Sequence, residues 1–389
     1  MKASKNTANI ESGRRLFDKA NAYASICSSE YSDRSLLVKT LCERVQQYRQ
    51  YSYNDIVNLL ICMVQGRLSV FSGAPGTGKT SICLILAHVL GLDTINKSEN
   101  CKDLENRSVL IPVERGWSSK RDFIGYFNPL TKSFDKNNRG AYNALEISNQ
   151  ETLLEDSLSV PPMLLILDEA NLSPMEYYWA DFMAVCDSTV PISIDLGEDA
   201  QFTIADSLKF LATINNDHTT ESLSPRLIDR AWIISLPQPE TPAEISFNDQ
   251  HAPVSMRNLM QTFGSIAAKD RSLDPEAESL LKTVYDFCKE KLGISVGPRT
   301  KIAIHNYCIV GEQLFDTTGT QDVSAIIAVD YAIAQRVLPK IQGNGTNYQN
   351  ALKEFSKELR ANNLRRSADI LTRIIQNGDN NMHYYQYFV

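Results

Sequence analysis

Residues 73–80 are Gly73-Ala74-Pro75-Gly76-Thr77-Gly78-Lys79-Thr80, a run that matches the pattern G-x-x-x-x-G-K-S/T. An apolar segment, 68–71, comes before this run and another, 82–87, follows it, so the local order is strand, loop and helix. Glycines let backbone N–H groups converge on phosphate oxygens, and the positive end of the following helix points the same way. The sequence therefore predicts a phosphate-binding loop. The alternative is an ordinary glycine-rich turn, and the two correct flanks argue against it.

Two side chains of the loop have expected roles. Lys79 should reach the β- and γ-phosphates of a nucleotide, and the Thr80 hydroxyl should hold Mg²⁺. The expected nucleotide-binding residues are Gly73, Ala74, Pro75, Gly76, Thr77, Gly78, Lys79, Thr80 and Ser81.

Apolar runs and helical segments alternate between residues 66 and 236. The runs that suit buried parallel strands are 68–71, 108–113, 163–167, 208–214 and 232–236. Helical segments are expected at about 79–90, 141–150 and 173–187. This alternation predicts a parallel sheet covered by helices on both faces. Alternating residues within 190–204 predict a β-hairpin inserted into it.

Both ends of the chain have other patterns. Residues 1–12 are expected to be disordered, 13–65 to form helices, and the chain from 254 onward to be helical without strands. Prolines at 237, 239 and 242 indicate a stiff linker. The expected units are a flexible start and helical lead-in (1–50), an α/β nucleotide-binding domain (51–238) and a helical domain (239–389).

Composition excludes several classes of protein. The net charge of −7 over 389 residues gives no global basic signature, so nucleic acid would be bound by a local patch or by a partner. No apolar run approaches the roughly 20 residues of a membrane helix, and the eight cysteines contain no C-x-x-C pair. No two of the five histidines have metal-ligand spacing. We expect a cytoplasmic protein with buried thiols and no membrane contact.

Two acidic residues follow the apolar run Met163-Leu164-Leu165-Ile166-Leu167. Ligands bind at the carboxyl ends of strands in open α/β sheets. Asp168 is therefore a candidate Mg²⁺ ligand, and Glu169 a candidate base or orienter of an attacking water. The alternative is an acidic strand end at the surface, which the upstream phosphate loop makes a weaker explanation.

Polar residues also follow the next apolar run, 210–214. Asn215 could hydrogen-bond the attacking water or the γ-phosphate, or it could only close the strand as an Asx-turn. Further on, Arg226 and Arg230 are four residues apart and share a helical face. An arginine at the rim of a domain can act on the γ-phosphate of a neighbouring subunit. The alternative is a pair of solvated or Asp229-paired arginines.

Together, these features in this order resemble an AAA+ ATPase over roughly residues 53–377. The resemblance implies a P-loop NTPase core with a parallel sheet between helices and a C-terminal all-α lid domain. It implies ATP and Mg²⁺ as cofactors, sensor 1 at Asn215, an arginine finger at Arg230 and a homo-oligomeric ring, expected to be a hexamer. It also implies a sensor 2 arginine near the start of a lid helix, for which Arg299 is the candidate.

A closer likeness is to the McrB-type branch, the motor of restriction systems, with MoxR-like and dynein-like branches also similar. It is carried by 117–130, which begins Trp117-Ser118-Ser119-Lys120-Arg121-Asp122-Phe123, and by Leu338-Pro339-Lys340-Ile341-Gln342-Gly343. The run Ile214-Asn215-Asn216-Asp217-His218-Thr219 departs from that branch, and so does Ala231 after Arg230. We therefore expect ATP as substrate, with GTP as the alternative.

Segment 114–140 combines six basic with three acidic residues and carries five aromatic ones. It could grip nucleic acid or polypeptide in a ring pore, or its aromatics could simply pack the loop. Three alternative functions agree with these features. The first is a motor subunit of a McrB-like antiviral system, which works with a separate nuclease or effector subunit and meets DNA through that partner or the pore. The second is a MoxR-like protein-remodelling ATPase, and the third is a nucleotide-gated assembly switch. A catalytic carboxylate at Glu169 argues against the switch.

Overall fold

The computed structural model describes residues 2–98, 101–188, 190–197, 200–215, 220–236, 245–318 and 323–388. The expected proline linker at 237–242 and the run 216–219 after Asn215 lie outside these ranges. Within them, no helix is both long enough and apolar enough to cross a membrane.

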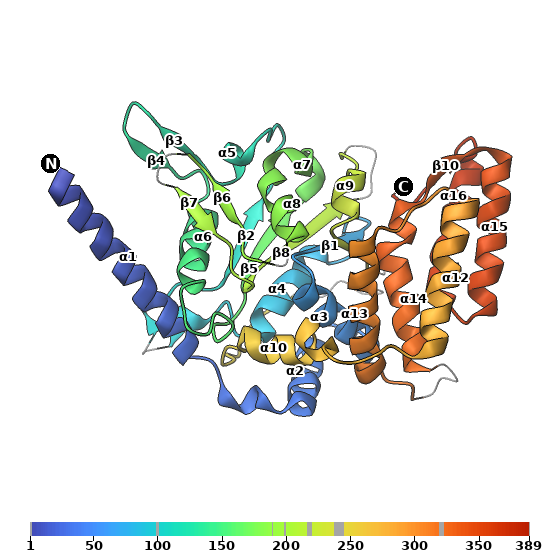
Figure 1. Ribbon diagram of the computed structural model, residues 1–389, viewed down its shortest axis with the longest axis horizontal. Helices are drawn as coiled ribbons and strands as arrows, with labels where there is room; N and C mark the ends of the chain where they lie inside the picture. The colour runs from blue at the N-terminus through green and yellow to red at the C-terminus, as the bar shows by residue number, and fades with distance from the viewer. Residues whose placement is uncertain are drawn as a thin grey trace.

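A parallel sheet of five strands forms the centre of the molecule (Figure 1). Across the sheet, the strands are β2 (Ser108–Pro112), β5 (Met163–Asp168), β8 (Leu208–Asn215), β1 (Leu68–Gly73) and β9 (Trp232–Ser235). All neighbouring pairs are parallel. The five apolar runs predicted to be buried strands are thus all confirmed, and β8 separates β1 from β5.

Helices cover both faces of the sheet, as strand β5 illustrates. Its Leu164 and Ile166 join one hydrophobic cluster, and its Leu165 and Leu167 join another on the opposite face. The first cluster includes residues of α2 (Arg34–Tyr48), α3 (Tyr53–Gln65) and α4 (Lys79–Val89). The second includes residues of α6 (Arg139–Glu151), α7 (Met175–Tyr178) and α8 (Ala180–Asp187). The predicted α/β core is confirmed.

The helix expected over 173–187 is interrupted at Trp179, whose φ of −109° and ψ of 10° are not helical. This side chain is fully buried, and its ring packs against Phe182 and Phe210. The predicted helical segment is therefore confirmed as two helices, α7 and α8, with tertiary packing at Trp179 interrupting the local periodicity. A short helix, α9 (Pro225–Ile228), precedes β9.

Two hairpins extend from the core (Figure 1). The predicted one is confirmed: β6 (Ser193–Asp195) pairs antiparallel with β7 (Gln201–Thr203). The other, between β3 (Tyr126–Asn128) and β4 (Ser133–Asp135), was not predicted. It follows α5 (Lys120–Phe123), and the Lys120 ammonium links the two hairpin regions by donating to the Asp195 carbonyl at 2.5 Å.

The C-terminal part is mostly helical, as predicted. It contains α10 (Met256–Thr262), α11 (Ser265–Ala268), α12 (Pro275–Lys291), α13 (Pro298–Leu314), α14 (Ser324–Arg336), α15 (Gly345–Ala361) and α16 (Arg365–Asn380). The expectation that it has no strands is wrong, since β10 (Gln342–Asn344) pairs with β11 (Tyr384–Gln386). Tyr385 of this pair is fully buried against Gly378, which fixes the chain end to α16.

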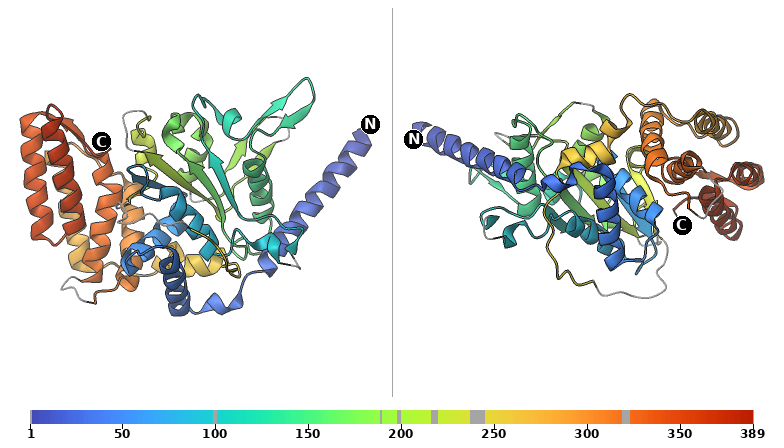
Figure 2. Two further views of the ribbon diagram at one scale, coloured as in Figure 1. Left: turned by 180° about the vertical axis from the view of Figure 1, so that it is seen from behind. Right: turned by 90° about the horizontal axis from the view of Figure 1, so that it is seen from below.

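The start of the chain also differs from expectation. Helix α1 (Lys2–Ser25) includes residues expected to be disordered, and its N-terminal end extends away from the rest of the molecule (Figure 2). The later part of α1 contacts α6.

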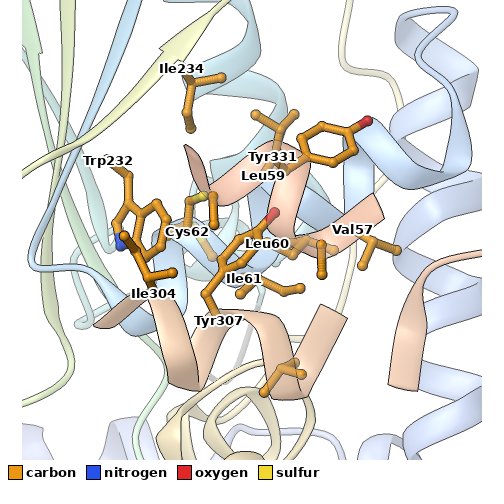
Figure 3. Packing of buried hydrophobic residues seen from close by; sticks show 14 of the residues in the cluster. Val57, Leu59, Leu60, Ile61, Cys62, Trp232, Ile234, Ile304, Tyr307 and Tyr331 are labelled. Carbon is orange, nitrogen blue, oxygen red and sulfur yellow. The ribbon is translucent and has the colours of Figure 1, made fainter. Parts of the chain in front are cut away.

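Helix α3 joins the sheet to the C-terminal helices. Apolar side chains of α3 pack between Trp232 and Ile234 of β9 and Tyr307 of α13 (Figure 3). Asn58 of α3 is buried there, and its Oδ1 accepts hydrogen bonds from the Tyr307 hydroxyl at 2.5 Å and from Gln335 Nε2 at 2.7 Å. The first hydrophobic cluster is therefore continuous from the sheet into α13 and α14.

Candidate functional site

Three strand ends meet at one edge of the sheet because β8 lies between β1 and β5. Gly73 at the end of β1 is in register with Asn215 at the end of β8, and Leu167 of β5 is in register with Ala212. The phosphate loop, Asp168 and Asn215 consequently meet at the carboxyl edge, where α/β sheets bind ligands.

The phosphate loop needs glycine at two positions. Gly76 and Gly78 have φ of +81° and +80°, which side-chain-bearing residues rarely adopt. Helix α4 starts at Lys79, whose ammonium donates to the carbonyls of Gly73 and Ala74 at 3.0 and 2.9 Å. The loop thus folds around the Lys79 side chain. The hydroxyl of Thr77, also buried, donates to the Ala74 carbonyl.

Two oxygen ligands suited to Mg²⁺ lie side by side. The Thr80 hydroxyl donates to Asp168 Oδ1 at 2.6 Å, and the Thr213 hydroxyl donates to the same oxygen at 2.7 Å. Magnesium prefers hydroxyl and carboxylate oxygens together with substrate phosphates. The residues present therefore fit a Mg²⁺ held by Thr80 and Asp168.

Glu169 has an unusual backbone conformation. It is exposed and has φ of 53° and ψ of 44°, in the left-handed region that costs energy for residues other than glycine. Its N–H donates to the Thr213 hydroxyl at 2.8 Å. Thr213, which the sequence did not single out, therefore holds both Asp168 and the backbone of Glu169.

Asn215 is positioned by another residue without a predicted role. The side chain of Asn171 is buried, and its Oδ1 accepts from the Asn215 N–H at 3.1 Å. Its Nδ2 donates back to the Asn215 carbonyl at 2.9 Å and to the Glu221 carbonyl at 3.1 Å. These hydrogen bonds hold the backbone N–H and carbonyl of Asn215 in place. The position from which the Asn215 side chain extends is therefore fixed.

These groups line one cavity of about 370 Å³. Most of the predicted site residues are among its walls: Pro75, Gly76, Gly78, Lys79, Thr80, Ser81, Asp168, Glu169 and Asn215. Arg49, just after α2, lines it too and was not predicted. The Arg49 guanidinium lies so close to Gly78 that a side chain at that glycine would collide with it. The cavity thus contains a cation additional to Lys79.

A second cavity, of about 430 Å³, lies between α3, β9, α14 and α16. The two cavities share no lining residue, but Tyr51 in the wall of the second is two residues after Arg49, and Leu236 in the same wall donates its N–H to the Ser72 carbonyl. Its walls combine apolar side chains with Arg366 and Arg373 of α16. Arg366 pairs with Asp55 at 2.7 Å, whereas Arg373 is exposed and pairs with none of the described residues.

The three predicted arginines, Arg226, Arg230 and Arg299, do not line either cavity. Arg230 Nε lies 2.7 Å from Asp187 Oδ1, and its Nη1 donates to the Arg226 carbonyl at 2.7 Å. The hydrogen bonds with Asp187 raise the pKa of Arg230 above its ordinary value. Arg299 pairs with the same Asp187, and Arg226 is exposed. The structure therefore brings Arg230 and Arg299 together, but away from the phosphate loop.

Most aromatic side chains of segment 114–140 pack against other side chains of the molecule. Phe123 is fully buried, Trp117 meets Tyr178 edge to face, and Phe134 packs on Tyr142. The Lys136 ammonium lies 3.8 Å from the centre of the Tyr142 ring. The side chain of Leu130, between β3 and β4, is by contrast 92% exposed.

The chain is similar to a family model and to solved structures. A family model described as a domain of unknown function (DUF8727) matches residues 253–384. No curated protein matches the chain. The crystal structure of a "putative ATPase" from Cytophaga hutchinsonii is similar over 78% of this chain and 83% of its own, with 15% identity and a TM-score of 0.44. A likeness this distant tells nothing about the activity of this chain, which has to be argued from its site.

Proposed function

We propose that the chain is an AAA+ ATPase that binds ATP with Mg²⁺ and hydrolyses the bond to its terminal phosphate. The observation that carries this proposal is the single cavity in which the phosphate loop, Asp168, Glu169 and Asn215 meet. Phosphoryl transfer needs positioning and charge stabilisation more than covalent chemistry, and these groups supply both. GTP is the alternative substrate.

Each group has a defined part in this proposal. Lys79 turns from the loop carbonyls to the β- and γ-phosphates, and Thr80 and Asp168 hold Mg²⁺, which neutralises the charge on those phosphates when bound. Glu169 orients the attacking water and accepts its proton. Asn215 hydrogen-bonds the water or the γ-phosphate.

We assign the base and the ribose to the second cavity. Its apolar side chains, such as Leu59 and Ile370, can cover a planar base, and its volume of about 430 Å³ is in the range of small-ligand sites. Arg373 lies in its wall without a described partner, so we assign the lid arginine to Arg373 in place of Arg299.

Nucleotide binding and turnover test the proposal. Lys79→Ala should abolish detectable ATP binding in calorimetry, and Glu169→Gln should bind ATP but release phosphate at least ~100-fold more slowly. The exposed Glu155, changed to Gln, is the matched control and should behave as wild type. Absence of binding of both ATP and GTP to the folded wild-type chain would overturn the proposal.

For the biological role, we propose a motor subunit of a McrB-like antiviral system. In this proposal, a hexameric ring of the chain drives a separate nuclease, and the residues 114–140 or the partner meet DNA. The likeness in segments 117–130 and 338–343 supports it. DNA should then stimulate turnover of ATP or GTP.

One observation favours a second candidate, a MoxR-like ATPase that remodels a protein client. The rings of Trp117, Phe123 and Phe134 are engaged within the molecule, so few remain for stacking on bases. The exposed side chain at the β3–β4 turn, Leu130, suits contact with a polypeptide. Turnover that DNA leaves unchanged and an unfolded protein stimulates would favour this candidate.

A further inference from the structure

A cluster of histidine and aspartate side chains lies at the end of α4 that is remote from the phosphate loop. His88, in the last turn of α4, is fully buried. Its Nδ1 lies 3.0 Å from Asp93 Oδ2 and its Nε2 lies 2.9 Å from Asp249 Oδ1. His251 Nε2 lies 3.1 Å from the other oxygen of Asp249. One ligand atom each from His88, Asp249 and His251 thus lies within 4.8 Å of the other two.

A metal cation can satisfy this arrangement. A neutral imidazole has one N–H and one lone pair, so a histidine with carboxylates at both nitrogens directs a lone pair at a negative oxygen. A proton on His88 would satisfy His88, but His251 Nε2 is buried and makes no hydrogen bond although Asp249 lies 3.1 Å away. One divalent ion accepts both Nε2 lone pairs and the carboxylate together.

We propose that His88, Asp249 and His251 bind one Zn²⁺ ion, with Asp93 orienting His88. Zinc takes imidazole nitrogens and carboxylate oxygens at about 2.0–2.2 Å, so tetrahedral ligands lie about 3.4 Å apart. The Nε2 atoms of His88 and His251 lie 2.9 and 3.1 Å from different oxygens of Asp249, and one ligand atom from each residue lies within 4.8 Å of the other two, so binding needs a modest adjustment of all three side chains. A carboxylate on the outer nitrogen of a zinc-binding histidine is a common second partner, and Asp93 supplies it.

The surroundings of the cluster suit a metal. Arg44 is a cation close to His251. The Arg44 guanidinium itself is occupied by the Val89 carbonyl and the Tyr31 hydroxyl. The Tyr48 hydroxyl donates to Asp249 Oδ1 at 2.5 Å. The side chain of Asp249 is 43% exposed, which leaves a path for the ion and room for a water ligand.

The location indicates what the ion would do. Segment 245–254 passes under the end of α4 on its way to the C-terminal helices, and Val254 donates its N–H to the Leu90 carbonyl at 3.2 Å. Gly91, with φ of +73°, has the His251 carbonyl only 2.5 Å from where a Cβ would be. Zinc would fasten this segment to the helix that begins at Lys79. Since α4 has 11 residues and is about 16 Å long, the ion would stabilise the fold and not touch the nucleotide.

The experiment is a metal titration of the full chain, without a histidine tag, after treatment with a chelator. Co²⁺ should produce the visible absorption of a tetrahedral site, saturating at one ion per chain, and one equivalent of Zn²⁺ should remove it. Zinc should also raise the midpoint of thermal unfolding. Wild-type protein that gives no such absorption and no shift in the midpoint would overturn the proposal, whatever the variants do.

Variants locate the ion. Asp249→Asn and His251→Ala, both in the partly exposed segment, should lose the Co²⁺ absorption and the thermal shift. The exposed His383, changed to Ala, and Asp168→Asn at the expected Mg²⁺ site are the controls and should keep both. Loss of the absorption in Asp168→Asn, or its retention in both cluster variants, would place the ion elsewhere and refute the assignment.

Discussion

Arg230 and Asp187 form an ion pair in which both oxygens of the carboxylate are engaged by the guanidinium. Arg299 binds one of the same oxygens. The resemblance to AAA+ ATPases implies different roles for these two arginines, an arginine finger for Arg230 and a sensor 2 arginine of the lid for Arg299. A shared carboxylate is hard to reconcile with both assignments, and it makes Asp187 a positioning residue for whichever arginine acts.

Arginine action between subunits is tested by mixing two inactive variants. Arg230→Ala should bind ATP normally but hydrolyse it roughly 100-fold more slowly or worse, because the neighbouring site loses a cation that stabilises the transition state. Glu169→Gln has the arginine but lacks the carboxylate. In mixed rings, some sites combine an intact Glu169 with an intact Arg230, so phosphate release should partly recover.

Two controls accompany this experiment. Arg360→Ala removes an exposed arginine of α15 and should leave turnover unchanged. Arg226→Ala tests the exposed alternative. If mixing restores nothing while Arg226→Ala shows the predicted defect and is rescued by mixing, the finger role belongs to Arg226 and the assignment to Arg230 is wrong.

The lid arginine is tested by comparing Arg373→Ala with Arg299→Ala. Arg373 lines the cavity proposed for the nucleoside, and Arg299 does not. We expect Arg373→Ala to weaken ATP binding about tenfold, equivalent to about 1.4 kcal/mol, and Arg299→Ala to leave it unchanged. Calorimetric titration measures both affinities, and the reverse order would restore Arg299 to the role that the sequence suggested.

Arg49 provides a test of the phosphate end of the site. Its guanidinium lies against Gly78, so a bound phosphate group would meet it. Arg49→Ala should weaken binding of ATP roughly tenfold, and Arg49→Lys should recover part of the loss because the charge is kept. Gly78→Ala should also bind ATP poorly, because alanine rarely adopts the positive φ of this position and its Cβ would collide with the Arg49 guanidinium. Equal ATP affinity for wild type and Arg49→Ala would show that Arg49 only braces the loop.

Lys209 should make stability depend on pH. Its side chain is buried and donates to the carbonyls of Val64 and Gly66, and burial, reinforced by Arg67, lowers its pKa to about 7. The unfolded chain keeps a value near 10.5, so between pH 7 and 10.5 the unfolded state binds more protons than the folded state. The contribution of Lys209 to the free energy of unfolding therefore rises with pH across that window.

The comparison that isolates this effect is Lys209→Met. Urea unfolding at pH 7, 8 and 9 should show the wild type gaining up to about 1.4 kcal/mol per pH unit relative to the variant. Lys282→Met, at an exposed position of α12, serves as control and should run parallel to the wild type. A difference between wild type and Lys209→Met that does not change with pH would contradict the lowered pKa.

The sequence was most informative where residues close to one another in the chain act together. The phosphate loop was recognisable because its glycines, Lys79 and Thr80 are contiguous. Asp168 and Asn215 could be placed because they end apolar strands, and parallel strand ends meet at one edge. Their convergence on one cavity is what the structure adds.

Residues that reach a site from distant segments had no local signal. Arg49 follows a helix with no motif, and Arg373 lies in the middle of an ordinary amphipathic helix. His88 and His251 are separated by most of the α/β part, so no spacing could pair them. Strands β3, β4, β10 and β11 were also missed.

The hydrophobic cluster that runs through α3 restricts how the C-terminal helices can respond to a nucleotide. Swinging α13 away from α3 would separate Tyr307 from Asn58 and expose apolar surface around Trp232, at a cost of several kcal/mol. We therefore expect helix α13 and the sheet to move together as one rigid body. Because Arg366 also ties α16 to Asp55 of α3, a movement that spares these contacts would begin farther from the sheet, at α15 (Figure 1).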